Sequence, residues 1–209
     1  AMARQFNIAG HDISFGITPK MMEVTSYYAR PTVEQLDSDT YELSDELEAS
    51  EKTDSAFNID LSMATSFFDD KVTLGATVKN IIGKSYKTST YIDPNTNQPT
   101  SKSFDIDPQA RVGVAWDLPL GFTLASDLDL TKNKAFFNGR DTRYLGVGAE
   151  WDIFNSLRLR AGMRTNLEDS DDTALTAGIG FNLFVVHLDL GAQYSDNNAA
   201  AGLQLGVEF

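Results

Sequence analysis

The stretch LGVGAEWDIFNSLRLRAGMR, residues 145–164, holds two runs in which apolar side chains alternate with glycines or charged side chains. Successive side chains of a β-strand point to opposite sides, so this period of two predicts two strands, each with one apolar face. The turn-forming residues FNS at 154–156 separate the runs and predict an antiparallel hairpin. The apolar members are Leu145, Val147, Ala149, Trp151, Ile153, Leu157, Leu159, Ala161 and Met163.

The same alternation recurs along the 209-residue chain, and it predicts an all-β, antiparallel fold of about ten strands in a single domain over residues 1–209. Tight turns alternate with longer polar connections, which is typical of an up-and-down barrel. The predicted strands are 12–30, 55–67, 71–90, 103–118, 121–133, 142–153, 156–168, 173–184, 185–195 and 200–209.

The face opposite the apolar one decides between two kinds of barrel. It carries mixed charges together with nine of the fifteen glycines, and glycine weakens a strand that is exposed to water. A narrow lumen explains both features, because glycines leave room for long arginine side chains that reach across to carboxylates. We therefore predict a transmembrane-type β-barrel; a soluble barrel that binds an apolar ligand inside is the alternative.

Charged residues of the polar face form the candidate site. Buried charges persist when they are paired and hydrogen-bonded, so we predict a lumen charge network that narrows the barrel. No convergent nucleophile and base are visible, the two histidines lie far apart in the strand order, and we expect neither an enzyme nor a cofactor or metal. The predicted network comprises Arg111, Asp127, Asp129, Glu150, Arg158, Arg160, Arg164 and Asp189.

The last residues, GLQLGVEF at 202–209, alternate in the same way and end on an aromatic residue. Such a strand resembles the signal that the outer-membrane barrel assembly machinery recognises in bacterial barrels. We assign this role to Leu203, Leu205, Val207 and Phe209.

Composition excludes several classes of protein. There are 17 Lys and Arg against 30 Asp and Glu, and the net charge of −13 argues against a nucleic-acid partner. The chain has no cysteine, so disulfides and thiolate metal sites are excluded. Residues 31–54 hold nine acidic residues and one lysine without the spacing of a calcium loop, and we interpret them as a solvated loop insertion with one short helix through Leu36, Leu43 and Leu47. Residues 1–4 are a candidate cloning remnant.

Several stretches, in order, resemble the C-terminal half of the TraF-like proteins named for conjugal transfer. They include ISFGITPKMMEV, VTLGATVKN, ASDLDLTKN, RYLGVGAEW and LRLRAGMRTNL, and the resemblance runs from Ile13 to Phe209. It implies an outer-membrane barrel, distantly similar to fatty-acid-transporter-like barrels, and it carries over no ligand or catalytic residue. Family members are typically longer before the ITPK strand, which leaves open whether these strands close by themselves or belong to a larger barrel. Another TraF family is thioredoxin-like, and the lack of cysteine separates this chain from it.

Together these inferences predict a non-enzymatic component of the transfer apparatus in the bacterial outer membrane. The expected partners are the lipid bilayer, the barrel assembly machinery and other transfer-apparatus proteins. A channel or carrier for small hydrophobic compounds is the alternative function, beside the soluble ligand-binding barrel.

Overall fold

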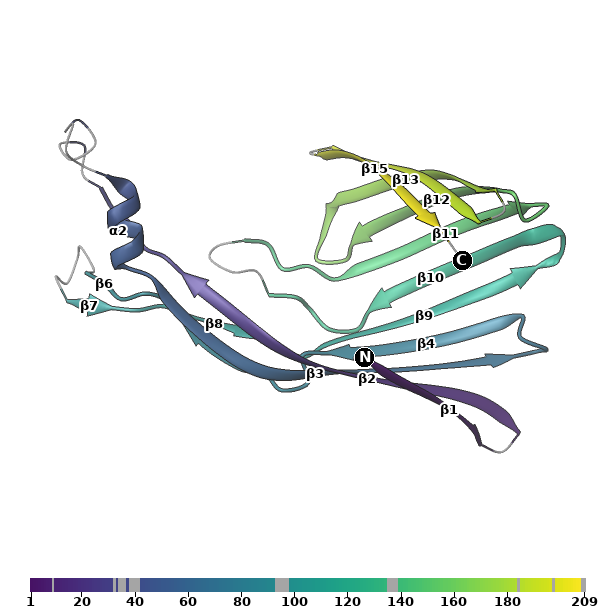
Figure 1. Ribbon diagram of the computed structural model, residues 1–209, viewed down its shortest axis with the longest axis horizontal. Helices are drawn as coiled ribbons and strands as arrows, with labels where there is room; N and C mark the ends of the chain where they lie inside the picture. The colour runs from purple at the N-terminus through teal and green to yellow at the C-terminus, as the bar shows by residue number, and fades with distance from the viewer. Residues whose placement is uncertain are drawn as a thin grey trace. The chain divides into compact units, whose positions relative to one another are not determined.

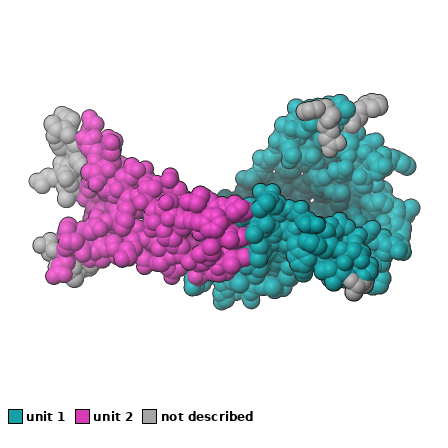
Figure 2. All heavy atoms as spheres, turned by 60° about the horizontal axis from the view of Figure 1, so that its bottom comes forward, with its two compact units in different colours: residues 1–18, 61–79, 109–209 teal, residues 19–60, 80–108 magenta. Residues whose placement is uncertain are grey.

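A computed structural model describes residues 1–8, 10–31, 33, 37, 42–92, 98–134, 139–183, 185–196 and 198–207. The described residues form two compact units, which are coloured separately in Figure 2. Unit 1 comprises residues 1–18, 61–79 and 109–209, and unit 2 comprises residues 19–60 and 80–108. The expectation of a single barrel domain stays a prediction.

The main element is an antiparallel sheet of 11 strands whose spatial order follows the chain. Figure 1 shows the strands of unit 1 curling in sequence from β1 to β15. These two strands are the edges of the sheet, which is therefore open within the described residues. The strands are β1 Met2–Ile8, β2 His11–Ser26, β3 Lys52–Phe67, β4 Val72–Lys79, β9 Gln109–Leu118, β10 Phe122–Asp129, β11 Tyr144–Ile153, β12 Leu157–Asn166, β13 Asp169–Leu183, β14 Val186–Ser195 and β15 Asn198–Val207.

The strand registers confirm that the alternation separates two faces. On one face Trp151 lies opposite Leu159 on β12 and opposite Phe122 on β10, with the Trp151 and Phe122 rings stacked at 5.1 Å. On the other face Glu150 lies opposite Arg160. Neighbouring residues of one strand therefore meet different surroundings, as the period of two requires.

The structure has one strand more in this sheet than the sequence analysis predicted. The sequence pattern does not predict strand β1, because Arg4 interrupts the apolar alternation of Met2, Phe6 and Ile8. Its residues pair with β2 from Met2↔Ile17 to Ile8↔His11.

Two predicted strands are each divided in the structure. The predicted strand 71–90 becomes β4 and the short β5 Lys84–Lys87, because Asn80 takes a left-handed conformation with φ 56°. The predicted strand 103–118 becomes β8 Ser103–Ile106 and β9. The pair β5 and β8, and the pair β6 Tyr91–Ile92 and β7 Pro99–Thr100, form two small sheets outside the main one.

Unit 2 has its own small core. Tyr86 of β5 is 1% exposed and its ring stacks on Phe104 of β8 at 5.5 Å. Asn58 of β3 is buried as well, and its side-chain amide donates to the carbonyl of Ile82 at 2.9 Å, while its oxygen accepts from the Ile82 N–H. These bonds satisfy backbone groups where the chain leaves the main sheet.

The acidic segment contains a short helix, α2 Leu43–Ala49, as the sequence allowed. Its side chains are exposed or half-buried, and Glu46 accepts a hydrogen bond from the backbone N–H of Arg30 at 3.0 Å. Residue Leu36, which the sequence also placed on this helix, lies outside the described residues. No helix among the described residues has the length and apolarity that a transmembrane helix needs.

Three hairpin connections of unit 1 place bulky apolar residues in the left-handed region. Phe68, Leu120 and Phe154 have φ of 57°, 66° and 55°, and all three side chains are largely exposed. They lie in the connections β3–β4, β9–β10 and β11–β12, at the ends of strands that run in the same direction.

Candidate functional site

Unit 1 curves around an open hollow of about 1580 Å³ on the charged, glycine-rich side of its sheet. In the space-filling view the recess lies within the teal unit (Figure 2). Its wall includes six of the eight residues of the predicted network: Arg111, Asp127, Glu150, Arg160, Arg164 and Asp189. The predicted charged face is therefore the inner face of a curved sheet.

A central cluster of three charged side chains joins strands β11, β12 and β14 of this wall. Arg160 of β12 donates from Nε to Oε2 of Glu150 on β11 at 2.5 Å, and from Nη1 to Oδ1 of Asp189 on β14 at 2.7 Å. The side chain of Arg160 spans β13, where Gly178 lies directly opposite it. One guanidinium thus links two carboxylates that lie three strands apart.

A second cluster forms around Arg111 on β9. Its Nε donates to Oδ1 of Asp129 at 2.6 Å, and its Nη1 lies 3.4 Å from Oδ1 of Asp127. Asp129 is buried, and its other oxygen accepts the backbone N–H of Tyr144 at 3.1 Å. The carboxylate of Asp129 therefore also ties the start of β11 to the end of β10.

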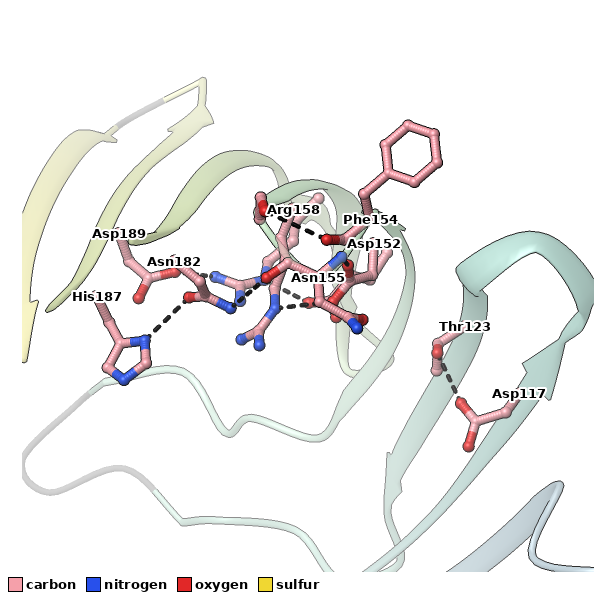
Figure 3. Close-up of polar contacts among 12 residues, drawn as sticks. Asp117, Thr123, Asp152, Phe154, Asn155, Arg158, Asn182, His187 and Asp189 are labelled. Atoms are coloured by element: carbon pink, nitrogen blue, oxygen red, sulfur yellow. Dashed lines mark hydrogen bonds and ion pairs between the residues drawn. The ribbon is translucent and has the colours of Figure 1, made fainter. Parts of the chain in front are cut away.

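Arg158 does not join the other predicted residues. Its Nε donates to Oδ2 of Asp152 at 3.2 Å, directly across the β11–β12 hairpin. Figure 3 shows this pair near the turn, where the backbone N–H of Asn155 donates to the other Asp152 oxygen at 2.7 Å. The predicted list missed Asp152, although its place opposite Arg158 follows from the hairpin register.

The histidine of the inner face lies close by. Figure 3 also shows His187 of β14 beside Asn182 of β13, with Nδ1 and the amide oxygen 3.0 Å apart. His11, the other histidine, packs its ring against Phe67 at 5.3 Å. The structure thus keeps the two histidines on separate strands. Among the described residues there is no group of three or more His, Asp or Glu side chains that could hold a metal ion.

Arg164 is the member of the predicted network without an acidic partner among the residues that the structure describes. Its guanidinium lies 4.4 Å from the ring centre of Tyr144. A cation over an aromatic face is attracted by the ring quadrupole. The phenol of Tyr144 in turn donates to Oδ2 of Asp172 at 2.9 Å. The predicted network thus resolves into separate clusters.

Glycines make room for these side chains, as the sequence analysis expected. A Cβ atom at Gly180 would lie 2.6 Å from Oδ1 of Asp189, and one at Gly146 would collide with Asp127. At Gly162, on the floor of the hollow, a Cβ would lie 3.0 Å from the carbonyl oxygen of Val147. Side chains at these positions would displace the charged groups or the neighbouring strand.

The outer face of unit 1 is apolar and exposed. It runs without a break across the registers from β3 to β15 and includes Trp116, Val147, Leu175 and Leu203, all exposed. Leu203, Leu205 and Val207 of the predicted assembly signal lie on this face, with Leu203 68% exposed. Phe209, the fourth member, lies outside the described residues.

Fold and site together define an all-β protein whose antiparallel sheet exposes an apolar face and turns a paired-charge, glycine-rich face to a hollow. The family model of the F plasmid transfer operon TraF protein matches residues 1–129, and the chain belongs to this family. The match includes the stretches ISFGITPKMMEV and VTLGATVKN, whereas RYLGVGAEW and the later strands lie beyond it. No curated protein and no solved structure matches the chain.

Proposed function

We propose that the protein is a non-enzymatic component of the conjugal-transfer apparatus and that unit 1 forms the wall of a β-barrel in the bacterial outer membrane. The strands of unit 1 span the bilayer, with the apolar face on lipid and the charged face on the lumen. Unit 2 lies outside the membrane-spanning segments. Membership of the TraF family supports the link to transfer.

The exposed apolar face carries this proposal. A monomer in water rarely exposes a contiguous apolar patch larger than a few hundred Å². Here leucine, valine, methionine and tryptophan are exposed on nine neighbouring strands, while Arg111 and Arg160 form ion pairs with carboxylates on the opposite face. The stacked Phe122 and Trp151, with exposed Trp116 on the next strand, gather near the hairpin tips. Outer-membrane barrels carry aromatic side chains in this way at the lipid–water boundary.

Arginine substitution at two adjacent residues of β14 tests which face meets lipid. Leu190 points to the apolar face and Gly191 to the hollow, where a Cβ would have nothing within 4 Å. We expect Leu190→Arg to lower the free energy of unfolding in lipid vesicles by about 2–4 kcal/mol, as for a charge on the lipid face of a barrel. Gly191→Arg, at nearly the same depth, is the matched control and should change it by less than about 1 kcal/mol.

Equal, small effects of the two arginines would contradict the membrane assignment, because a surface substitution in water is usually worth no more than about 0.5 kcal/mol. An independent check is the detergent requirement of the purified protein. We expect it to aggregate without micelles and to migrate as a heat-modifiable band on gels.

The link to plasmid transfer has its own test. Deletion of the gene from a plasmid-bearing donor should lower the frequency of transfer, and the wild-type gene supplied in trans should restore it. An unchanged frequency would remove the transfer role and leave the membrane assignment standing.

A channel or carrier for small hydrophobic compounds is the second candidate, and the size of the hollow supports it. Liposome swelling with solutes of graded size tests it. Swelling by the wild-type protein, and faster swelling by Arg160→Ala, would favour this function, since Arg160 crosses the wall of the hollow.

A further inference from the structure

The two edge strands of the main sheet run in the same direction. The sheet has 11 strands in an antiparallel order that follows the chain, so every second strand points the same way, and β1 and β15 are the first and the last. Direct closure of the sheet would therefore require a parallel β1–β15 ladder. Bacterial single-chain outer-membrane barrels have an even number of antiparallel strands.

Both edge strands border the same hollow and lack cover on their faces. The wall of the hollow includes Ala3 of β1 and residues 200–204 of β15. All side chains of β1 are exposed, and so are those of β15 apart from Gly206. An unpaired edge also leaves a row of backbone N–H and C=O groups without partners, which lipid cannot satisfy.

We propose that the sheet closes through an odd number of further strands of the same polypeptide, inserted between β15 and β1 and antiparallel to both. A strand joined to either edge by a hairpin runs antiparallel to that edge. Because the two edges are parallel to each other, it is antiparallel to the other edge as well. One such strand turns both free edges into ordinary ladders and makes the strand number even.

A second copy of the chain does not meet this requirement. The inference rests on the proposed membrane function, in which every copy crosses the bilayer in the same orientation. All β1 and β15 strands of such copies point the same way, so any pairing between copies would be parallel. The inserted strands should alternate apolar side chains toward lipid with small or polar ones toward the hollow.

Cysteine pairs test the closure in the native gene product extracted from the cell envelope, since residues 1–209 contain no cysteine. Residues 3, 5 and 7 of β1 and residues 200, 202 and 204 of β15 point to the hollow and give nine double variants. Neighbouring strands lie about 4.8 Å apart, within the Cα range of a disulfide, whereas an inserted strand separates the edges by about 10 Å or more. We expect no disulfide in any of the nine variants.

The matched control is Thr176→Cys with Gln193→Cys, which lie directly opposite each other on β13 and β14 and also face the hollow. This pair should oxidise readily. A β1–β15 disulfide in the monomer would overturn the proposal, as it would show direct closure.

A photo-crosslinking amino acid at Gly202 then identifies the neighbour of β15, because a side chain there meets open space. We expect the adduct, mapped by mass spectrometry, to join Gly202 to a segment of the same polypeptide outside residues 1–209. An adduct to a second copy or another protein, or no adduct together with rapid hydrogen exchange along β15, would overturn the proposal. None of these readouts depends on detergent requirement or arginine tolerance, so failure of the closure is distinguishable from failure of the membrane assignment.

Discussion

At the scale of single residues, Arg160 holds two carboxylates, and its removal leaves Glu150 and Asp189 without their shared cation. Hydrogen bonds to charged groups contribute about 1.5–3 kcal/mol each, and partial exposure of this side chain reduces that figure. We expect Arg160→Ala to lower the free energy of unfolding by about 1–2 kcal/mol in urea titrations. Arg158→Ala, which removes one ion pair with Asp152, is the control and should cost less. An equal or larger loss at Arg158 would contradict the bridging role of Arg160.

Glycine at 162 is required by the close approach of β11. A Cβ there would lie 2.9 Å from Oγ1 of Thr176 and 3.0 Å from the carbonyl oxygen of Val147. Overpacking of this kind costs about 1–3 kcal/mol, and we expect Gly162→Ala to lose stability in that range. The control Gly191→Ala enters open space and should be neutral or slightly stabilising, since glycine is unfavourable within a strand. Thermal unfolding in micelles measures both, and equal midpoints would show that the sheet adjusts at Gly162.

At the scale of elements, the hairpin tips store backbone strain. Leu120 has φ 66° in the β9–β10 connection, whereas Leu118, two residues earlier, is extended at φ −101°. Asparagine tolerates the left-handed region better than leucine. We expect Leu120→Asn to raise the free energy of unfolding by about 0.5–1 kcal/mol, a fraction of the usual cost of such strain. The control Leu118→Asn relieves no strain and should lower the free energy of unfolding. If chemical denaturation showed Leu118→Asn to be the more stable of the two variants, backbone strain at Leu120 would be contradicted.

The start of β3 carries an ion pair that lies in unit 2. Lys84 Nζ donates to Oδ1 of Asp54 at 2.7 Å, and this hydrogen bond holds the pKa of Asp54 below its ordinary value. Because the folded pKa is depressed, the pair stabilises the fold above the unfolded pKa, and this contribution is lost as the pH falls through the folded pKa. We expect an NMR titration of Asp54 to give a midpoint below the ordinary pKa of an aspartate. Lys84→Met should return it upward, and an unchanged midpoint would exclude Lys84 as the cause.

The β-strands of unit 1 could be predicted because their two faces differ in chemistry. From β10 to β15 the predicted and observed strands agree closely, since inward glycines and charges alternate with apolar residues over most of their length. Strand β1 lacks this contrast, because Arg4 stands among its apolar residues. The break after β4 depends on the left-handed backbone conformation of Asn80. The alternation of apolar and polar side chains does not encode this conformation.

For the candidate site, the sequence predicts on which face of the sheet each charged residue lies, but not which residue it pairs with. Alternation places Arg111, Arg160 and Asp189 on the inner side whatever the register. Which carboxylate each arginine meets depends on which strands lie side by side and on how far each side chain reaches. The side chain of Arg160 passes over Gly178 of β13 and reaches Asp189 on β14, two strands away. The guanidinium of Arg164 lies over the ring of Tyr144. These outcomes follow from the three-dimensional order of the sheet.

At the scale of the whole molecule, the charge of −13 and the hollow are separate features. The wall of the hollow carries three arginines and three carboxylates, so its charges cancel. Residues 31–54 alone hold nine of the 30 acidic residues and belong to unit 2. The acidic segment therefore belongs to a different unit from the hollow. Substitutions in this segment should alter solubility without changing the unfolding of unit 1, as circular dichroism in micelles can test.

The equal numbers of positive and negative side chains along the hollow have a consequence for ion selectivity. Rings of one sign of charge make a pore select for ions of the opposite sign. Here each arginine of the two clusters lies within 3.4 Å of a carboxylate, so the field along the hollow is short in range. In planar bilayers under a potassium chloride gradient, any current through the protein should therefore reverse close to zero voltage. Arg160→Gln would leave Glu150 and Asp189 uncompensated and should shift that reversal potential toward the value for potassium.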